Sequence, residues 1–380
     1  MWFGIVIFTE KIIGVWDYMK LMKTTEAVGQ VLCHDITQII PGVKKDAVFR
    51  KGHIITKEDI PVLLSVGKDT IYIWENDETM MHENEAAEVL YRMSACGTKK
   101  IEADTQSGVS CGTASKMHPS SVKEGKIEVI ADCDGLLKVD SKKLEKVNSF
   151  GELMIATRHG NTTVKKGDKL AGTRIIPLVI KKDKLKEASN ICEDGPILDI
   201  KPFVVRKAAI ITTGNEVYHG RIQDAFTPVI EKKIAEFGAQ MMFHEVFDDD
   251  DKKITEGCLR AIEAGAEIVF CTGGMSVDPD DKTPLAIKNT GARIVSYGSP
   301  VLPGAMFLLS YYDAGDRLVP ICGLPGCAMY NKRTIFDIVL PRLMARDMIY
   351  ADELAGLGEG GLCLNCDVCT FPNCGFGKGF

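Results

Sequence analysis

The sequence predicts an α/β protein whose main domain is a doubly wound, three-layer αβα domain, preceded by a small α+β domain and a β-rich domain. Three observations predict this arrangement. From residue 206 onward, apolar runs of strand length alternate with longer helical patterns, which is typical of βαβ units. Three of those runs end in glycine turns that lead into helices. The chain of 380 residues is also too long for one ordinary core, so several domains are expected.

Each segment has its own pattern. Residues 23–75 alternate apolar residues with glycine turns, which predicts strand, strand, helix, strand. Residues 77–96 have a helical apolar face, and residues 122–180 contain short apolar strands with a turn over 164–172. The predicted segments are an N-terminal arm or mis-assigned start (1–22), a small α+β unit with a polar insertion (23–121), a β-rich domain (122–190), the main domain (206–348), and a glycine linker with a cysteine-rich tail (349–380).

Composition restricts the partners and the compartment. The formal net charge of −6 argues against a nucleic acid or an anionic membrane surface as partner. The apolar run at residues 1–8 is too short to span a bilayer and has no basic start or cleavage site. Most of the thirteen cysteines are scattered through strand and helix patterns, unlike a secreted disulfide framework. We therefore expect a cytoplasmic protein.

A glycine turn in the main domain has the pattern of an anion site. Thr272, Gly273, Gly274, Met275 and Ser276 follow an apolar strand and precede a helical pattern over 282–289. Glycines let backbone N–H groups approach an anion, and a helix N-terminus favours phosphate. Asp281 could hold a divalent cation that bridges phosphates, since hard cations prefer oxygen ligands. An ordinary βα turn is the alternative.

Two more junctions of this kind occur. Thr213 and Gly214 end the apolar run 207–213 and are followed by Glu216, and residues 321–326 lead from a strand into a helix. Ligands of open α/β sheets bind at the carboxyl ends of strands. The three junctions therefore predict one shared site. The run Asp248–Asp251 belongs to it too, unless it is only the acidic start of the next helix.

The order and spacing of these motifs resemble the molybdopterin-binding domain of molybdenum cofactor biosynthesis proteins, above all molybdopterin molybdenumtransferases and the gephyrin E-domain. The segment 213–216 is similar to the T/S-G-D-E turn of that family, and Asp249–Asp250 is similar to its D-D segment. Residues 273–277 with Asp281 and Thr283 resemble G-G-x-S-x-G-x-x-D-x-T, and residues 323–326 resemble the start of G-L-P-G-N-P.

The resemblance implies a ligand and a set of site residues. The ligand is molybdopterin or its adenylate, with Mg²⁺ and molybdate, and the carboxylates implied to be catalytic are Glu216, Asp250 and Asp281. These three, together with Asp249, are implied to lie near Mg²⁺ or molybdate. The implied cofactor-binding residues are Thr213, Gly214, Asp224, Thr272, Gly273, Gly274, Ser276, Thr283, Gly323, Pro325 and Gly326. A homo-oligomer is also implied.

The chain departs from the family pattern at three places. The D-S-N turn of the family appears as Asp224-Ala225-Phe226, and Cys327 replaces the Asn of G-L-P-G-N-P. Ala305 follows Pro303-Gly304 where a lysine that contacts phosphate would fall. Cys327 is either a reactive thiol or a small residue in a tight turn.

Three functions therefore stay open. The first is Mg²⁺-dependent insertion of molybdate into molybdopterin, and the second is a non-catalytic carrier or maturation factor for a client molybdoenzyme. The third is a nucleotide pyrophosphatase, because the same domain occurs in the competence-damage-inducible family.

The C-terminal tail carries a second signal. Cys363, Cys366, Cys369 and Cys374 are separated by two, two and four residues. This run is similar to the bacterial ferredoxin C-x₂-C-x₂-C pattern and predicts a 4Fe–4S cluster. A four-thiolate zinc site is the main alternative, and free or oxidised thiols are the other. The glycines between 356 and 361 predict a flexible tether.

Overall fold

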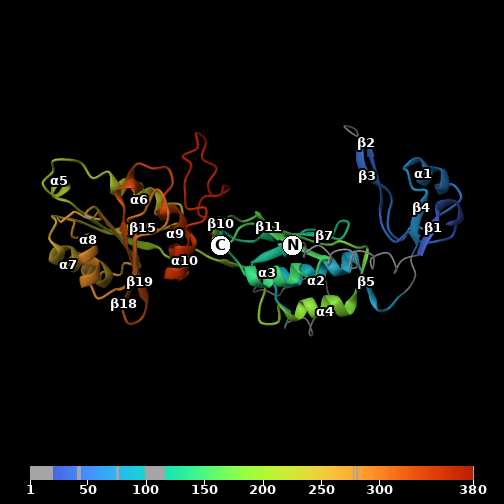
Figure 1. Ribbon diagram of the computed structural model, residues 1–380, viewed down its shortest axis with the longest axis horizontal. Coiled ribbons are helices and arrows are strands. Elements are labelled where there is room, and N and C mark those ends of the chain that lie inside the picture. The colour runs from blue at the N-terminus through green and yellow to red at the C-terminus, as the bar shows by residue number, and fades with distance from the viewer. Residues whose placement is uncertain are drawn as a thin grey trace, which may run out of the picture. The chain divides into compact units, whose positions relative to one another are not determined.

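The computed structural model describes residues 20–40, 44–73, 77–98, 116–276, 278–279 and 281–379. Residues 1–19 of the predicted arm, residues 99–115 of the predicted insertion, and Val277 lie outside the described residues. The chain divides into two compact units, and its elements are labelled in Figure 1. The first unit comprises residues up to 132 with 139–158 and 166–199, and the second comprises 133–138, 159–165 and 200–380.

The first part of unit 1 contains the predicted strand, strand, helix and strand, preceded by a further strand and a 3-10 helix. Its elements are β1 (Lys20–Lys23), η2 (Thr24–Glu26), β2 (Ile36–Ile40), β3 (Lys44–Phe49), α1 (Asp59–Ser65) and β4 (Thr70–Ile73). β1 pairs antiparallel with β4, and β2 pairs antiparallel with β3. Leu32, Ile55 and Leu63 are buried in a small core of their own.

The second part of unit 1 is a four-stranded antiparallel sheet in the order β6-β7-β11-β9. Its elements are β5 (Met80–His82), α2 (Glu83–Ala95), β6 (Met117–Pro119), β7 (Lys126–Ala131), α3 (Ser141–Asn148), β9 (Leu153–Thr157), β11 (Lys169–Ile175), β12 (Val179–Lys181) and α4 (Lys182–Asn190). The turn predicted over 164–172 is too long, because β11 already begins at Lys169 and buries Leu170, Thr173 and Ile175.

Unit 2 is built on a six-stranded sheet in the order β15-β14-β16-β19-β18-β17. Its strands are β14 (Lys207–Thr213), β15 (Gln240–Phe247), β16 (Ile268–Thr272), β17 (Arg293–Tyr297), β18 (Leu308–Asp313) and β19 (Leu318–Leu324). The helices are α5 (Asn215–Tyr218), α6 (Phe226–Ala235), α7 (Asp251–Glu263), α8 (Thr283–Asn289), η4 (Gly326–Met329), α9 (Ile335–Met344) and α10 (Ala351–Gly356). A three-stranded sheet has the order β10 (Thr162–Val164), β8 (Gly135–Val139), β13 (Leu198–Lys201).

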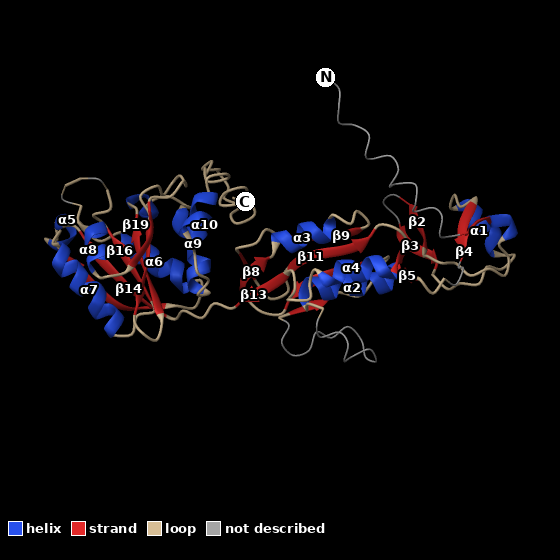
Figure 2. Ribbon diagram, turned by 60° about the horizontal axis from the view of Figure 1, so that its bottom comes forward, coloured by secondary structure: helices blue, strands red, loops and turns tan. Residues whose placement is uncertain are grey.

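Alternating residues of the central strands divide the core of unit 2 between two faces. Ile210 of β14 and Phe270 of β16 pack against α6 and α9. Ile211 and Cys271, the next residue of each strand, pack against α7 and α8 on the opposite face. The predicted three-layer αβα domain is therefore confirmed (Figure 2).

The strand order reverses its direction at β14. This strand pairs in parallel with β15 on one side and with β16 on the other, so the chain reverses its direction of winding there. Ligands of open α/β sheets bind outside the carboxyl ends of the strands at such a reversal. Among the described residues, no helix is long and apolar enough to cross a membrane.

Candidate functional site

Two glycine turns meet at the carboxyl ends of β14 and β16. A Cβ atom on Gly273, whose φ is +83°, would lie 2.2 Å from the carbonyl oxygen of Thr213. A Cβ atom on Gly274 would lie 2.8 Å from the Thr283 hydroxyl. Only glycine fits these positions, because the two turns approach each other so closely.

Hydroxyl groups hold the two turns together. The Thr213 hydroxyl donates to the carbonyl oxygen of Thr272 at 3.0 Å and lies 3.0 Å from the hydroxyl of Thr283. The backbone N–H of Thr283 donates to the carbonyl of Gly274 at 3.2 Å. Thr213 and Thr283, both implied to bind the cofactor, are buried, and their hydrogen bonds hold the Gly273-Gly274 turn in place.

Two buried oxygens of this rim have no hydrogen-bond partner among the described residues: Thr272 Oγ1 and Asp248 Oδ1. Thr272 ends β16, and Asp248 follows β15 directly. A buried polar atom without a partner costs about 1–3 kcal/mol.

The implied catalytic carboxylates lie at the same edge, and backbone N–H groups orient them. Asp281 Oδ2 accepts from the N–H of Ser276 at 2.7 Å, and Asp249 Oδ2 accepts from the N–H of Asn215 at 3.2 Å. Asp250 caps α7 by accepting from the N–H groups of residues 252 and 253. Asp250 therefore has the capping role that was the alternative explanation of the acidic run.

Glu216 differs from these aspartates because it is exposed on the short α5. Its Oε2 lies 3.6 Å from the position of a Cβ atom on Gly214. Asn215, the residue between them, binds Asp249, so the structure brings Glu216 close to the acidic run after β15. No group of three or more His, Cys, Asp or Glu side chains in the described part of the chain is arranged to hold a metal ion.

Asp224 uses its carboxylate within the fold. It accepts from the N–H groups of Phe226 and Thr227 and from the hydroxyls of Thr227 and Thr212. Burial raises the pKa of Asp224, but hydrogen bonds from Thr227 and Thr212 bring it below its ordinary value. The implied contact of Asp224 with the cofactor therefore competes with its structural role.

Sequence reasoning missed two neighbours of the rim. His244 Nε2 lies 3.1 Å from the Thr212 hydroxyl and 3.6 Å from Asp224 Oδ2. The Tyr297 hydroxyl donates to the carbonyl of Met275 at 3.1 Å. Burial is the main cause that raises the pKa of Tyr297, and the charge of Asp281 adds to it. Both residues lie on strands away from any glycine motif, so no sequence signal marked them.

The junction after β19 completes the rim. A Cβ atom on Gly323 would lie 2.5 Å from Met275 Cε, so this glycine makes room for the side chain that follows the Gly-Gly turn. Pro325 precedes η4, and Gly326 is exposed at its start. Burial raises the pKa of Cys327, which favours a small residue in a tight turn over a reactive thiol.

The cysteine-rich tail packs against unit 2. Cys363, Cys366, Cys369 and Cys374 line one cavity of about 360 Å³. The predicted flexible tether is wrong, because α10 occupies part of it and its glycines are closely packed. A Cβ atom on Gly361 would lie 2.4 Å from the carbonyl oxygen of Pro300.

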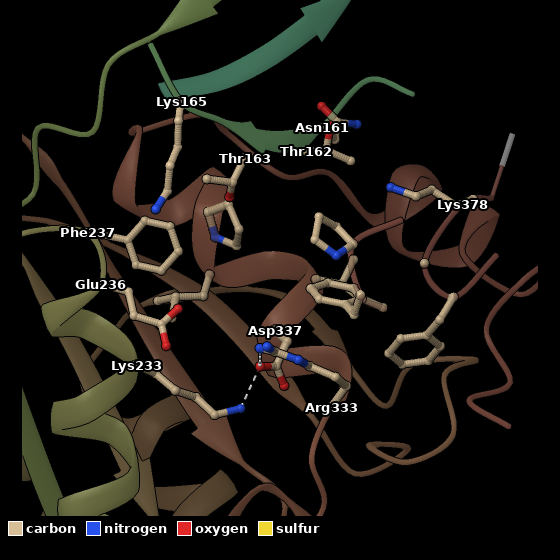
Figure 3. Close-up of a pocket in the computed structure, with 17 residues that line it drawn as sticks. Asn161, Thr162, Thr163, Lys165, Lys233, Glu236, Phe237, Arg333, Asp337 and Lys378 are labelled. Carbon is tan, nitrogen blue, oxygen red and sulfur yellow. Dashed lines mark hydrogen bonds and ion pairs between the residues drawn. The ribbon is translucent and has the colours of Figure 1, made fainter. Parts of the chain in front are cut away.

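A second cavity, of about 370 Å³, lies next to the cysteine cavity and shares Arg333, Phe371 and Phe376 with it (Figure 3). Arg333 and Lys233 both bind Asp337 Oδ1, at 2.9 and 2.6 Å. The Arg333 guanidinium also lies 5.0 Å from the centre of the Phe371 ring.

Comparison with known proteins identifies the domain that carries the rim. Residues 209–345 match the family described as a probable molybdopterin binding domain, and residues 21–75 match a domain of unknown function, DUF8806. The predicted resemblance of residues 206–348 to molybdopterin-binding domains is therefore confirmed.

Individual relatives match over short stretches. A competence-damage inducible protein of Bacillus subtilis is 30% identical over 23% of this chain and 21% of its own length. A molybdopterin molybdenumtransferase of Staphylococcus epidermidis is 26% identical over 40% of this chain and 38% of its own length. The chain thus spans about a fifth of the length of the first kind of relative, and well under half of the second.

Two solved structures also match parts of this chain, at low sequence identity and low TM-score. The tungsten cofactor synthesizing protein MoaB from Pyrococcus furiosus is 18% identical and covers 37% of this chain and 89% of its own, with a TM-score of 0.29. A molybdenum cofactor biosynthesis protein from the same organism is 11% identical and covers 86% of this chain and 64% of its own, with a TM-score of 0.25.

Proposed function

We propose that the rim at the carboxyl ends of β14 and β16 binds molybdopterin or its adenylate and assists Mg²⁺-dependent insertion of molybdate. The observation that supports this most is the pair of unpartnered oxygens, Thr272 Oγ1 and Asp248 Oδ1, beside the Gly273-Gly274 turn at the winding reversal. The terminal phosphate of the ligand would lie against the glycine backbone, and its polar groups would satisfy the two oxygens.

The donor set of the rim suits Mg²⁺, which prefers carboxylate oxygens and keeps several waters. Backbone N–H groups orient the carboxylates of Asp281 and Asp249, through Ser276 and Asn215. Glu216 is exposed and can turn toward them. When bound, Mg²⁺ would neutralise charge on the phosphates and the leaving nucleotide. The protein's own contribution is to orient the carboxylates and the pterin.

Turnover of adenylated molybdopterin tests this function. With molybdate and Mg²⁺, the protein should release AMP, and Glu216→Gln or Asp281→Asn should reduce the rate at least ~10²-fold while weakening binding less, because an oriented charge in the transition state is lost. Glu231→Gln, on the exposed side of α6, removes an equal charge away from the rim and should leave the rate unchanged. Normal turnover by both rim variants would refute the carboxylate assignment.

A carrier or maturation factor for a client molybdoenzyme is the second candidate. It is favoured by the hydrogen bonds that Asp224 accepts from the N–H groups of Phe226 and Thr227 and by Ala305 in place of a lysine. In that function the rim holds finished cofactor, and the cysteine-rich tail carries a cluster or contacts the client. Such a protein would bind the adenylate without releasing AMP.

A nucleotide pyrophosphatase is the third candidate, favoured by the match to competence-damage inducible proteins. It would hydrolyse the pyrophosphate bond of a simple adenosine diphosphate ester with Mg²⁺ and without molybdate. The AMP assay separates the three candidates when it is run with and without molybdate on both substrates.

A further inference from the structure

We infer that Cys363, Cys366, Cys369 and Cys374 together ligate one iron–sulfur cluster that is fixed onto unit 2. This inference does not rest on the ligand of the rim. The two family matches, at residues 21–75 and 209–345, end before the tail. Thiolate sulfur is the ligand that such clusters require.

Spacing brings the first three sulfurs to one side of a short loop. Gaps of two residues let consecutive thiolates converge, and the fourth cysteine follows after a gap of four residues. All four line the same cavity of about 360 Å³. The four cysteines, which the sequence predicts to be neighbours, therefore lie around the same cavity.

A cluster with four irons needs one thiolate for each iron, and the loop supplies four cysteines. A structural zinc ion would instead need four sulfurs about 2.3 Å from one point. The cavity of about 360 Å³ that the four cysteines help to line has room for a group larger than one ion.

Backbone hydrogen bonds and core packing position both sides of the loop. The N–H of Cys363 donates to the carbonyl of Leu302, and the N–H of Leu302 donates to the carbonyl of Gly361, both at 2.8 Å. At the other end Phe376 is only 5% exposed in the core beneath α9. Cys363 and Cys374 pack against that core, whereas Cys366 and Cys369 are exposed.

Cations stand beside the loop. The Arg333 side chain interacts with Cys369 and Asp337. Lys378 is close enough to Cys374 for their charges to interact. Lys332 Nζ donates to the carbonyl of Asp367 inside the loop at 3.2 Å. Positive neighbours favour thiolates and stabilise the net negative charge of a cluster with four thiolates.

Anaerobic purification of the full chain, followed by assays of iron, acid-labile sulfide and zinc with a visible absorption spectrum, tests the inference. We expect about four iron and about four sulfide per chain. Cys369→Ser should lose most of both, whereas Cys133→Ser, a half-buried cysteine outside the loop, should retain them. Far-UV circular dichroism should be the same for both variants, since Cys369 is exposed.

Each other outcome overturns the inference. One zinc without sulfide would make the loop a zinc site, and absence of metal after anaerobic reconstitution would leave free thiols. Iron and sulfide retained in Cys369→Ser would exclude this residue as a ligand.

Arg333 offers an independent test through the reduction potential. Arg333→Gln removes a positive charge beside Cys369 and should make the potential more negative at unchanged iron content. Lys288→Gln removes an equal charge from the exposed side of α8 and should not change it. Equal potentials in the two variants would mean that the cluster does not lie beside Arg333.

Discussion

At the residue scale, the close contact of Gly273 with β14 has a direct consequence for stability. Gly273→Ala would place a Cβ atom 2.2 Å from the Thr213 carbonyl at a φ of +83°. The positive φ costs about 1 kcal/mol for an L residue, and the clash adds to it. We expect a loss of at least ~2 kcal/mol in the free energy of unfolding and loss of ligand binding at the rim, measured by urea denaturation and by titration with ligand.

Gly291 provides the matched control. Its φ is +85°, but no atom lies within 4 Å of the position of its Cβ. Gly291→Ala should therefore cost only about 1 kcal/mol and leave the rim intact. If the two variants lost equal free energy of unfolding, the requirement for glycine at position 273 would come from its backbone conformation alone and not from contact between the turns.

The buried carboxylate of Asp347 predicts a pH dependence. Burial raises its pKa, but hydrogen bonds from Lys138 and Lys201 and the charge and hydrogen bond of Arg342 lower it from 3.8 to about 2. Because the pKa is lower in the folded state, the stabilisation is present above about pH 4 and is lost as the pH falls toward 2. A shift of this size corresponds to about 2 kcal/mol.

Unfolding of Asp347→Asn as a function of pH measures this contribution. The variant should lose at least ~2 kcal/mol at neutral pH, since three cations lose their partner, and its stability should fall less steeply between pH 4 and 2. Asp316→Asn breaks an exposed pair with Arg317 and should cost less than about 1 kcal/mol. An unchanged acid slope in the Asp347 variant would contradict the assignment.

At the residue scale, the sequence predicted backbone roles better than side-chain roles. The glycines at 214 and 273 were recognisable because turns at strand ends restrict the residue type locally. The hydrogen bond from Thr212 to Asp224 and the position of His244 depend on strands that are distant in the sequence. No local pattern carries that information.

At the element scale, Asp250 combines two roles that a pair of substitutions can separate. It caps α7, whose first turn otherwise leaves N–H groups without partners. Asp250→Asn keeps an acceptor that caps nearly as well, so stability should stay within about 0.5 kcal/mol. Asp250→Ala should cost about 1 kcal/mol.

The activity of the two variants then decides the second role. If Asp250 also helps to hold Mg²⁺, Asn should lose Mg²⁺-dependent AMP release as fully as Ala does, because an amide carries no charge. Activity that follows stability, with Asn active and Ala impaired, would leave Asp250 as a helix cap alone.

The strands of the αβα domain could be predicted from the sequence because their residue patterns match the surroundings that each strand has in the sheet. β14 and β16 are continuous apolar runs, as expected for parallel strands that are covered on both faces. β11 extends further back than predicted, because Gly172 interrupts its pattern but still pairs with Glu128 across the sheet. Tertiary pairing there overrides the preference of glycine for turns.

At the scale of the whole molecule, the set of chain segments that form unit 2 could not be predicted from the sequence. It includes residues 133–138 and 159–165, which the sequence places in a β-rich domain. Lys138 binds both Asn161 and Asp347, the latter 209 positions further along the chain. Such long-range ion pairs leave no periodic trace in the sequence.

The tail is likewise part of unit 2, and this predicts its effect on stability. Phe376 is 5% exposed and packs in the core that α6 and α9 form with the sheet. Phe376→Ala should lower the free energy of unfolding of unit 2 by about 3 kcal/mol, since it removes buried area and leaves a cavity. Val368→Ala, at a side chain that is 78% exposed, should change it by less than about 0.5 kcal/mol.

Urea denaturation of metal-free protein should separate this packing effect from any effect of metal. If the tail is bound to the domain by its own core contacts, the metal-free Phe376→Ala variant unfolds at a lower urea concentration than the metal-free parent. If the two midpoints coincide, the tail packs only when metal is bound, and Phe376 contributes to stability through the cluster. The closely packed Gly361 and the backbone bonds of Cys363 lead us to expect the first result.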